Sequence, residues 1–178
     1  MTVRPLAVIV GCESLDFNNK EVEFFTKYNP FGLILFERNC RDQKQIISLT
    51  ERFRGLVNRQ DAPVLIDQEG GRVARLRPPN WKSMPPAIIF GKLFGKNIKA
   101  AEAAIKLNYR LIAEDLRLCG ININCAPVID LPIFPILSFS VTRPVQFAIH
   151  CASQNPLSLL VYADLEIIIS SPEGVYSS

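Results

Sequence analysis

The sequence lacks several features that mark large classes of protein. Its 178 residues include a single histidine and five cysteines without any C-x-x-C pair, so a zinc site is not expected. The net charge of +3 is scattered, and no block of about five or six like charges or basic-aromatic pattern indicates nucleic acid as a partner. No apolar run reaches the roughly 18 residues of a membrane-spanning helix, so no membrane partner is expected.

Glycine-rich nucleotide motifs are also missing. No G-x-G-x-x-G follows the first apolar run and no phosphate-binding loop occurs, which argues against a nucleotide site, and we expect no cofactor. The cysteines are odd in number and irregularly spaced, as expected for free thiols in a reducing cytosol. One alternative is a lipoprotein signal, because "LAVIVGC" (6–12) follows Arg4. Its apolar stretch of about five or six residues is shorter than the roughly 7–15 that a signal needs, so a buried first strand and a cytoplasmic location are favoured.

What the sequence does contain is an alternation of short apolar runs and helical patterns. The strands are expected at residues 5–10, 32–36, 63–66 and 121–129, and the helices at about 21–28, 42–58 and 99–119. Near-continuously apolar strands separated by helices are typical of a parallel sheet covered by helices. Polar residues follow three of these strands, at 37–39, 67–69 and Asp130. Ligands bind at such carboxyl ends in both (β/α)₈ barrels and doubly wound sheets, and the missing nucleotide motifs favour the barrel.

Caps and buried faces can be predicted for the helices. Asn18 or Asn19 is expected to cap the first, Asp42 the second, and Gly120 to follow the third. The predicted buried face of the second helix comprises Ile46, Leu49, Phe53, Leu56 and Val57. That of the third helix comprises Ala100, Ala103, Ala104, Leu107 and Leu111. Residues 70–93 are rich in proline and predict a long functional loop.

The stretch "PVLIDQEGGRVARLRPP" (63–79) concentrates the polar chemistry at one strand end. Asp67 and Glu69 would share a face if the strand continued, and carboxylates can accept hydrogen bonds from sugar hydroxyls. Arg72 and Arg75 are three residues apart, so a helical turn after the two glycines would place them side by side. The alternative is that these acids and arginines form salt bridges that close the loop.

Three segments in order, "GLILFERNCRD", "PVLIDQEGGRVARLRPP" and "ININCAPVIDL", resemble the family-3 glycoside hydrolases. They are most similar to bacterial cytosolic β-N-acetylhexosaminidases, which remove N-acetylglucosamine during cell-wall (peptidoglycan) recycling. The resemblance covers residues 7–131 and implies an α/β fold of the (β/α)₈ TIM-barrel type. By position, Asp67 and Arg75 match sugar-binding residues of that family. Glu69, Arg72 and Asp130 are further candidates for the pocket.

The rest of the sequence departs from this family. The resembled enzymes carry an acid/base histidine in a K-H-x-P-G-H-G motif and a nucleophilic aspartate further along, and this sequence has no such motif. His150 lies in "FAIHCAS" and is not expected to be catalytic, so no catalytic residue is assigned. From Pro132 no residue can be matched, Arg143 included. A complete barrel takes about 250 residues, so we expect residues 1–131 to form the first four βα units and 132–178 to be a divergent, possibly frameshifted tail.

Three functions stay open from the sequence. The first is a truncated and impaired β-N-acetylhexosaminidase, and the second is a remnant that binds N-acetylglucosamine-containing saccharides without cleaving them. The third is a barrel enzyme with Asp67, Glu69 and Asp130 as magnesium ligands, although no metal site is assigned. In each case a half-barrel leaves open strand edges, so self-association is expected.

Overall fold

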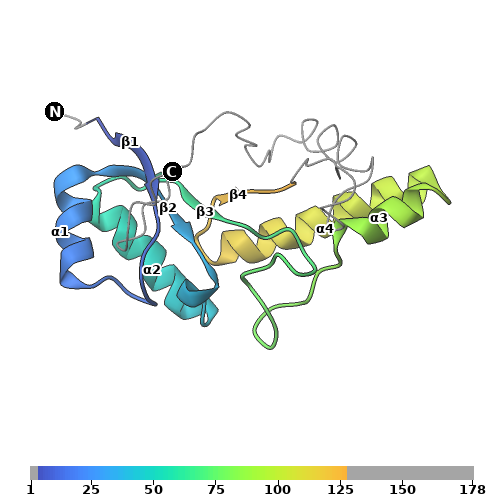
Figure 1. Cartoon of the computed structure of the whole chain (residues 1–178), viewed down its shortest axis with the longest axis horizontal. Helices are drawn as coiled ribbons and strands as arrows, with labels where there is room; N and C mark the ends of the chain where they lie inside the picture. Colours follow the sequence, from blue (N-terminus) through green and yellow to red (C-terminus); the bar gives the residue numbers. More distant parts are fainter. Residues whose placement is uncertain (1–3, 128–178) are drawn as a thin grey trace, which may run out of the picture. The chain divides into compact units, whose positions relative to one another are not determined.

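The computed structural model describes residues 4–127, and it confirms the predicted alternation of strands and helices. In chain order the elements are β1 (Leu6–Val10), α1 (Asn19–Tyr28), β2 (Pro30–Leu35), the 3₁₀ helix η1 (Glu37–Asn39), α2 (Gln43–Leu56), β3 (Val64–Ile66), α3 (Ala87–Phe94), α4 (Ile98–Leu118) and β4 (Ile123–Asn124) (Figure 1). The described chain divides into two units, one of residues 4–66 with 117–123 and one of residues 67–116 with 124–127.

The strands follow one another in the sheet in the order β1-β2-β3-β4. The β1–β2 and β2–β3 pairs are parallel, with Leu33 opposite Val64 and Leu35 opposite Ile66. β2 and β3 are almost entirely buried, which explains why these strands lack a polar alternation. β4 is shorter than the predicted 121–129, because asparagine side chains replace part of its backbone ladder. The Val64 N–H, for example, donates to Asn122 Oδ1 at 2.7 Å.

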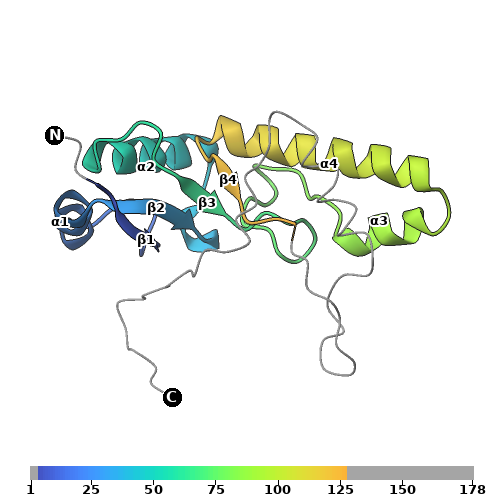
Figure 2. The ribbon, with the colours of Figure 1, turned by 90° about the horizontal axis from the view of Figure 1, so that it is seen from above.

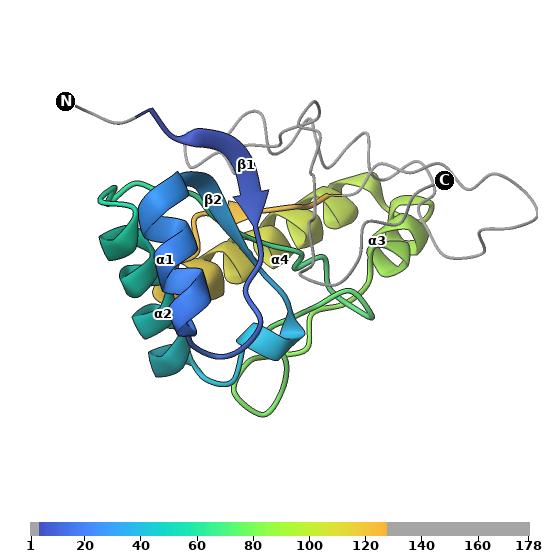
Figure 3. The same cartoon turned by 60° about the vertical axis from the view of Figure 1, so that its left-hand side comes forward.

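In the first unit, α1 and α2 lie side by side against the strands (Figure 3). Phe25 of α1 meets Phe53 of α2 edge to face, with ring centroids 5.5 Å apart, and Phe17 packs on Phe25 at 4.8 Å. Four of the five residues predicted for the buried face of α2 are buried, and only Leu56 is half-buried. The aromatic contacts add directional packing to the hydrophobic area that holds the two helices together.

Both predicted N-caps are confirmed. Asn18 Oδ1 accepts from the Glu21 N–H at 3.0 Å while Glu21 Oε2 accepts from the Asn18 N–H at 2.9 Å, forming a capping box. Asp42 Oδ1 accepts from the Gln45 N–H at 2.9 Å. This hydrogen bond, together with the one from Arg41, lowers the pKa of the Asp42 carboxyl.

In the second unit, α3 lies along the first part of α4 (Figure 2), with Phe90 packed on Ile105. Residues 70–93, predicted as a loop, therefore contain most of a helix.

The predicted buried face of α4 is wrong, since Leu107 and Leu111 are 59% and 42% exposed. The buried residues are instead Ala101, Ile105, Asn108, Ile112 and Leu116. These buried residues also have helical spacing. Because the polar Asn108 lies among them, the sequence pattern favours the neighbouring stripe of alanine and leucine, which is more apolar.

Within residues 4–127 no helix is long and apolar enough to cross a membrane. Several large apolar side chains are exposed on the helices of the second unit: Ile88, Ile89, Ile98, Leu107 and Leu111. The predicted self-association stays a prediction.

Substitutions at two separate glycines, Gly120 and Gly55, test the packing of the first unit. Gly120 has φ +75°, and a Cβ there would lie 2.6 Å from Thr50 Oγ1, whereas a Cβ on Gly55 in α2 would meet nothing within 4 Å. We expect Gly120→Ala to lower the free energy of unfolding by about 1–3 kcal/mol. Gly55→Ala should raise it by up to about 1 kcal/mol because a helical glycine is lost. Urea unfolding followed by circular dichroism measures both, and equal effects of the same sign would contradict the packing at Gly120.

Candidate functional site

The candidate site is built on the turn that follows β3. The strand ends at Ile66, so Asp67 is the first residue beyond it and the condition for Asp67 and Glu69 to share a strand face is not met. The N–H groups of Glu69 and Gly70 both donate to the Val73 carbonyl, at 2.9 and 3.1 Å, and the chain reverses there. With this reversal, an antiparallel bridge between Gly70 and Val73, the condition for Arg72 and Arg75 to lie side by side is not met either.

The two glycines are required by conformation and by space. Gly70 and Gly71 have φ values of +100° and +62°, in the region that other residues rarely adopt. A Cβ on Gly70 would come within 2.5 Å of the Pro85 carbonyl oxygen, and one on Gly71 within 2.6 Å of Pro86 Cβ. The glycine pair thus allows the reversed chain to pack against the proline segment without a clash.

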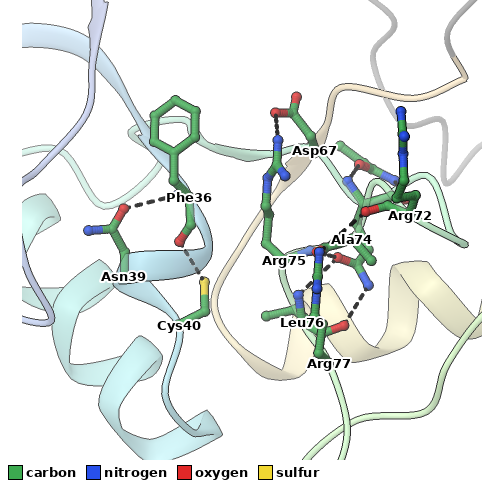
Figure 4. Close-up of polar contacts among 11 residues, drawn as sticks. Phe36, Asn39, Cys40, Asp67, Arg72, Ala74, Arg75, Leu76 and Arg77 are labelled. Carbon is green, nitrogen blue, oxygen red and sulfur yellow. Dashed lines mark hydrogen bonds and ion pairs between the residues drawn. The ribbon is translucent and has the colours of Figure 1, made fainter. Parts of the chain in front are cut away.

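The reversal brings Asp67 and Arg75 together (Figure 4). Arg75 Nη2 donates to Asp67 Oδ2 at 2.9 Å, and the two side chains are 23% and 26% exposed. The salt bridge predicted as the alternative is therefore present, yet both partners remain accessible. Arg75 Nε is buried and has no hydrogen-bond partner among the described residues. A buried N–H without an acceptor costs free energy, so Nε contributes nothing to the stability of this ion pair.

Two residues that the sequence analysis missed hold this arrangement. Gln68, 4% exposed, accepts on Oε1 from the backbone N–H groups of Arg75 at 2.7 Å and Leu76 at 3.0 Å, and its Nε2 donates to the Leu76 carbonyl at 3.0 Å. Asn124, 1% exposed, accepts from the Gln68 N–H and donates to the Gln68 carbonyl, both at 2.9 Å. The available signal for Asn124 is a polar residue within an otherwise apolar strand pattern, whereas Gln68, between Asp67 and Glu69, gives no such signal.

The other predicted site residues are placed differently. Glu69 lies near Tyr109 of α4, where burial and then the Glu69 charge raise the pKa of the Tyr109 hydroxyl to about 12. Arg72 is exposed on the turn, its carbonyl accepts from Arg77 Nη2 at 3.3 Å, and its side chain points away from the Asp67–Arg75 pair (Figure 4). Asp130, Arg143 and His150 lie outside the described residues. The structure thus brings together Asp67 and Arg75, but not Arg72 with Arg75.

A cysteine completes the surroundings of Asp67. Burial, the Asp67 charge and a hydrogen bond to the Asp67 side chain raise the pKa of the Cys125 thiol to about 11. The neutral thiol is therefore the form that faces the carboxylate at neutral pH. In the other unit, burial raises the pKa of Cys12 to about 12. The four cysteines between residues 4 and 127 are all free, as predicted.

The polar residues after β2 have a structural role. Asn39 is fully buried, and its Nδ2 donates to the carbonyls of Cys12 at 3.1 Å and Ser14 at 2.8 Å, while its Oδ1 accepts from the Phe36 N–H at 2.9 Å (Figure 4). Arg38 Nε also donates to the Cys12 carbonyl, at 3.1 Å. These side chains fix the loop that follows β1 rather than present an open polar site.

The magnesium alternative is not tested by this geometry, and it stays a hypothesis. No three histidine, cysteine, aspartate or glutamate side chains of the described residues are grouped to hold a metal ion. Asp67 is paired with a cation, and the third proposed ligand, Asp130, lies beyond the described part of the chain.

The parallel sheet and its strand-end residues define an α/β protein of the TIM-barrel type. Residues 4–136 match the model of the glycosyl hydrolase family 3 N terminal domain. The chain therefore belongs to glycosyl hydrolase family 3, as its resemblance to this family implied.

Its relatives include enzymes named beta-hexosaminidase. That of Xanthomonas oryzae pv. oryzae is 32% identical over 126 residues, 70% of this chain and 36% of the relative. That of Bordetella pertussis is 40% identical over 108 residues, 58% of this chain and 30% of the relative. The chain thus spans about a third of the length of these curated relatives.

Solved structures agree with this family. NagZ from Neisseria gonorrhoeae, in complex with N-trifluoroacetyl-D-glucosamine, superposes with a TM-score of 0.66 at 29% identity, covering 71% of this chain and 37% of that one. A family 3 β-N-acetylglucosaminidase from Paenibacillus sp. gives a TM-score of 0.57 at 27% identity over 67% of this chain and 22% of that one. The predicted fold class, an α/β chain with the first units of a (β/α)₈ barrel, is confirmed.

The Cys125 thiol offers a test of the site geometry. Asp67→Asn removes a negative charge beside the thiol, so the Cys125 pKa should fall, and more thiolate should be present at a given pH below about 11. We expect alkylation of Cys125 at pH 8.5 to accelerate by about tenfold for each unit of pKa lost. Peptide mass spectrometry after timed iodoacetamide treatment resolves the individual cysteines. Cys12, whose pKa is not raised by Asp67, is the internal control, and an unchanged Cys125 rate would contradict the contact with Asp67.

Proposed function

We propose that this chain contributes the third-strand part of the sugar pocket of a β-N-acetylhexosaminidase acting on terminal N-acetylglucosamine of peptidoglycan fragments. Asp67 and Arg75 are the sugar-binding residues in this proposal. The single observation that carries it is their ion pair at the carboxyl end of β3, partly exposed, in a family 3 chain. Parallel-sheet proteins of the barrel type bind their ligands at this end of the strands.

The chemistry of the pair suits a neutral, hydroxyl-rich ligand. Asp67 supplies carboxylate oxygens that accept from hydroxyl groups, and Arg75 has a buried Nε–H for which no described residue provides an acceptor. A sugar oxygen meets the pair at its accessible part, about a quarter of each side chain, whereas Nε itself is closed to solvent. Further support comes from the relatives named beta-hexosaminidase and from the N-trifluoroacetyl-D-glucosamine complex of the Neisseria enzyme.

A carbohydrate-binding role without cleavage is the second candidate. The observation that favours it is that the sequence holds no K-H-x-P-G-H-G motif, the source of the acid/base in the resembled enzymes. A retaining glycosidase needs both a nucleophilic carboxylate and an acid/base group. Under this proposal the isolated chain binds the sugar and is impaired in hydrolysis.

The first test concerns the role of Asp67. Asp67→Ala should abolish detectable N-acetylglucosamine binding, because it removes the carboxylate acceptors and leaves the Arg75 guanidinium unpaired. Glu69→Ala is the matched control and should keep at least part of the affinity, since Glu69 lies beside Tyr109 instead. Isothermal titration calorimetry measures both. An unchanged titration of Asp67→Ala, with its circular dichroism spectrum intact, would refute the sugar-binding role.

The second test concerns turnover. The isolated 178-residue chain should hydrolyse a chromogenic N-acetylglucosaminide at no more than background rate. General acid–base catalysis alone is worth about 10²–10⁴-fold, and the covalent step also needs the nucleophile. A robust rate that disappears in His150→Ala would contradict this expectation and assign the acid/base role to His150.

A further inference from the structure

We infer that Gln68 is the positioning residue of this site: its side-chain amide fixes the backbone at Arg75 so that the guanidinium meets Asp67. The inference rests on the proposed sugar-binding role of Asp67 and Arg75. The hydrogen bonds of the Gln68 side chain go to backbone groups of Arg75 and Leu76, not to the guanidinium or the carboxylate. Gln68 acts on the backbone from which the guanidinium extends.

The need for such a residue follows from the path of the chain. Asp67 and Arg75 are eight residues apart, and the chain reverses between them. The hydrogen bonds of the turn end at Val73, two residues before Arg75. The Arg75 N–H is held instead by Gln68 Oε1 at 2.7 Å. An arginine side chain has many rotamers, so its guanidinium reaches a defined carboxylate reliably only if its backbone is fixed.

Gln68 is suited to this task because it is itself held on both sides. Its backbone N–H and carbonyl are both bonded to the Asn124 side chain, which belongs to the neighbouring strand. Its side chain makes three hydrogen bonds to Arg75 and Leu76, as acceptor and as donor. Through these hydrogen bonds the buried Gln68 connects the end of β4 to the loop that carries Arg75 and Leu76.

The chain offers a matched control at the other end of β3. Asn122 Oδ1 accepts from the Val64 N–H at 2.7 Å, so it also uses a side-chain amide to hold this strand. This hydrogen bond joins Asn122 to Val64 and involves no group of Arg75 or Leu76. Asn122→Ala should therefore lower stability without affecting the Asp67–Arg75 pair.

The experiment compares Gln68→Met, Gln68→Glu and Asn122→Ala by nuclear magnetic resonance of the full chain. The probe is the Arg75 Nε–H signal, assigned by its loss in Arg75→Lys. In Gln68→Met this signal should shift and its hydrogen exchange accelerate about tenfold or more. In Asn122→Ala it should stay unchanged. Gln68→Glu keeps both acceptor bonds but replaces the donor to the Leu76 carbonyl with an oxygen, so it should retain the signal only while the introduced carboxyl is protonated.

N-acetylglucosamine affinity is measured on the same samples. Gln68→Met should lose about tenfold or more in affinity and Asn122→Ala less than about twofold. If even the unsubstituted chain binds no sugar, the proposed function fails, while the Arg75 signal still decides the positioning role. A folded Gln68→Met protein with an unchanged Arg75 signal would overturn it.

If Gln68→Met does not fold, hydrogen exchange in the unsubstituted chain tests the positioning role of Gln68. The backbone amides of Arg75 and Leu76 should then exchange about tenfold or more slower than in an unstructured peptide, because Gln68 Oε1 accepts from both. Exchange at the unstructured rate would show that Gln68 does not hold the loop, and would equally overturn the inference.

Discussion

The reciprocal hydrogen bonds between Gln68 and Asn124 are the interaction on which the candidate site depends. β3 ends at Ile66 and β4 has only two residues, so no long backbone ladder reaches the strand ends. Asn124 instead pairs with both backbone groups of Gln68, and Gln68 pairs with the loop at Arg75 and Leu76. Removing either amide would leave buried backbone groups unsatisfied, at a cost of about 1–3 kcal/mol for each group.

Much of the fold could be predicted from the sequence because its signals are local. Near-continuous apolar runs, the caps Asn18 and Asp42, and the left-handed Gly120 all act over a few residues. The buried face of α4 could not be predicted in the same way. Its stripe includes Asn108, and which of two adjacent stripes is buried depends on what packs against the helix.

The candidate site was predictable in part for similar reasons. Asp67 and Arg75 can be identified by their position and by the resemblance, but the sequence does not show the turn that brings them together. Two glycines at positive φ, confined by Pro85 and Pro86, reverse the chain there. The role of Gln68 could not be predicted, because a side chain that binds only backbone groups leaves no pattern of charge in the sequence. Its role becomes visible only when the partners of each buried polar atom are known.

Polar strand ends therefore have two different uses in this chain. After β2, Asn39 is fully buried and its side chain makes three hydrogen bonds to backbone groups, so it holds a loop. After β3, Gln68 has the equivalent structural task, and this leaves Asp67 and Arg75 about a quarter exposed. A fully buried ion pair would carry a large desolvation cost and could not meet a ligand. A fully exposed pair would be mobile and screened by solvent. At this intermediate exposure a sugar hydroxyl can replace water at the accessible part of the pair and gain a fixed partner.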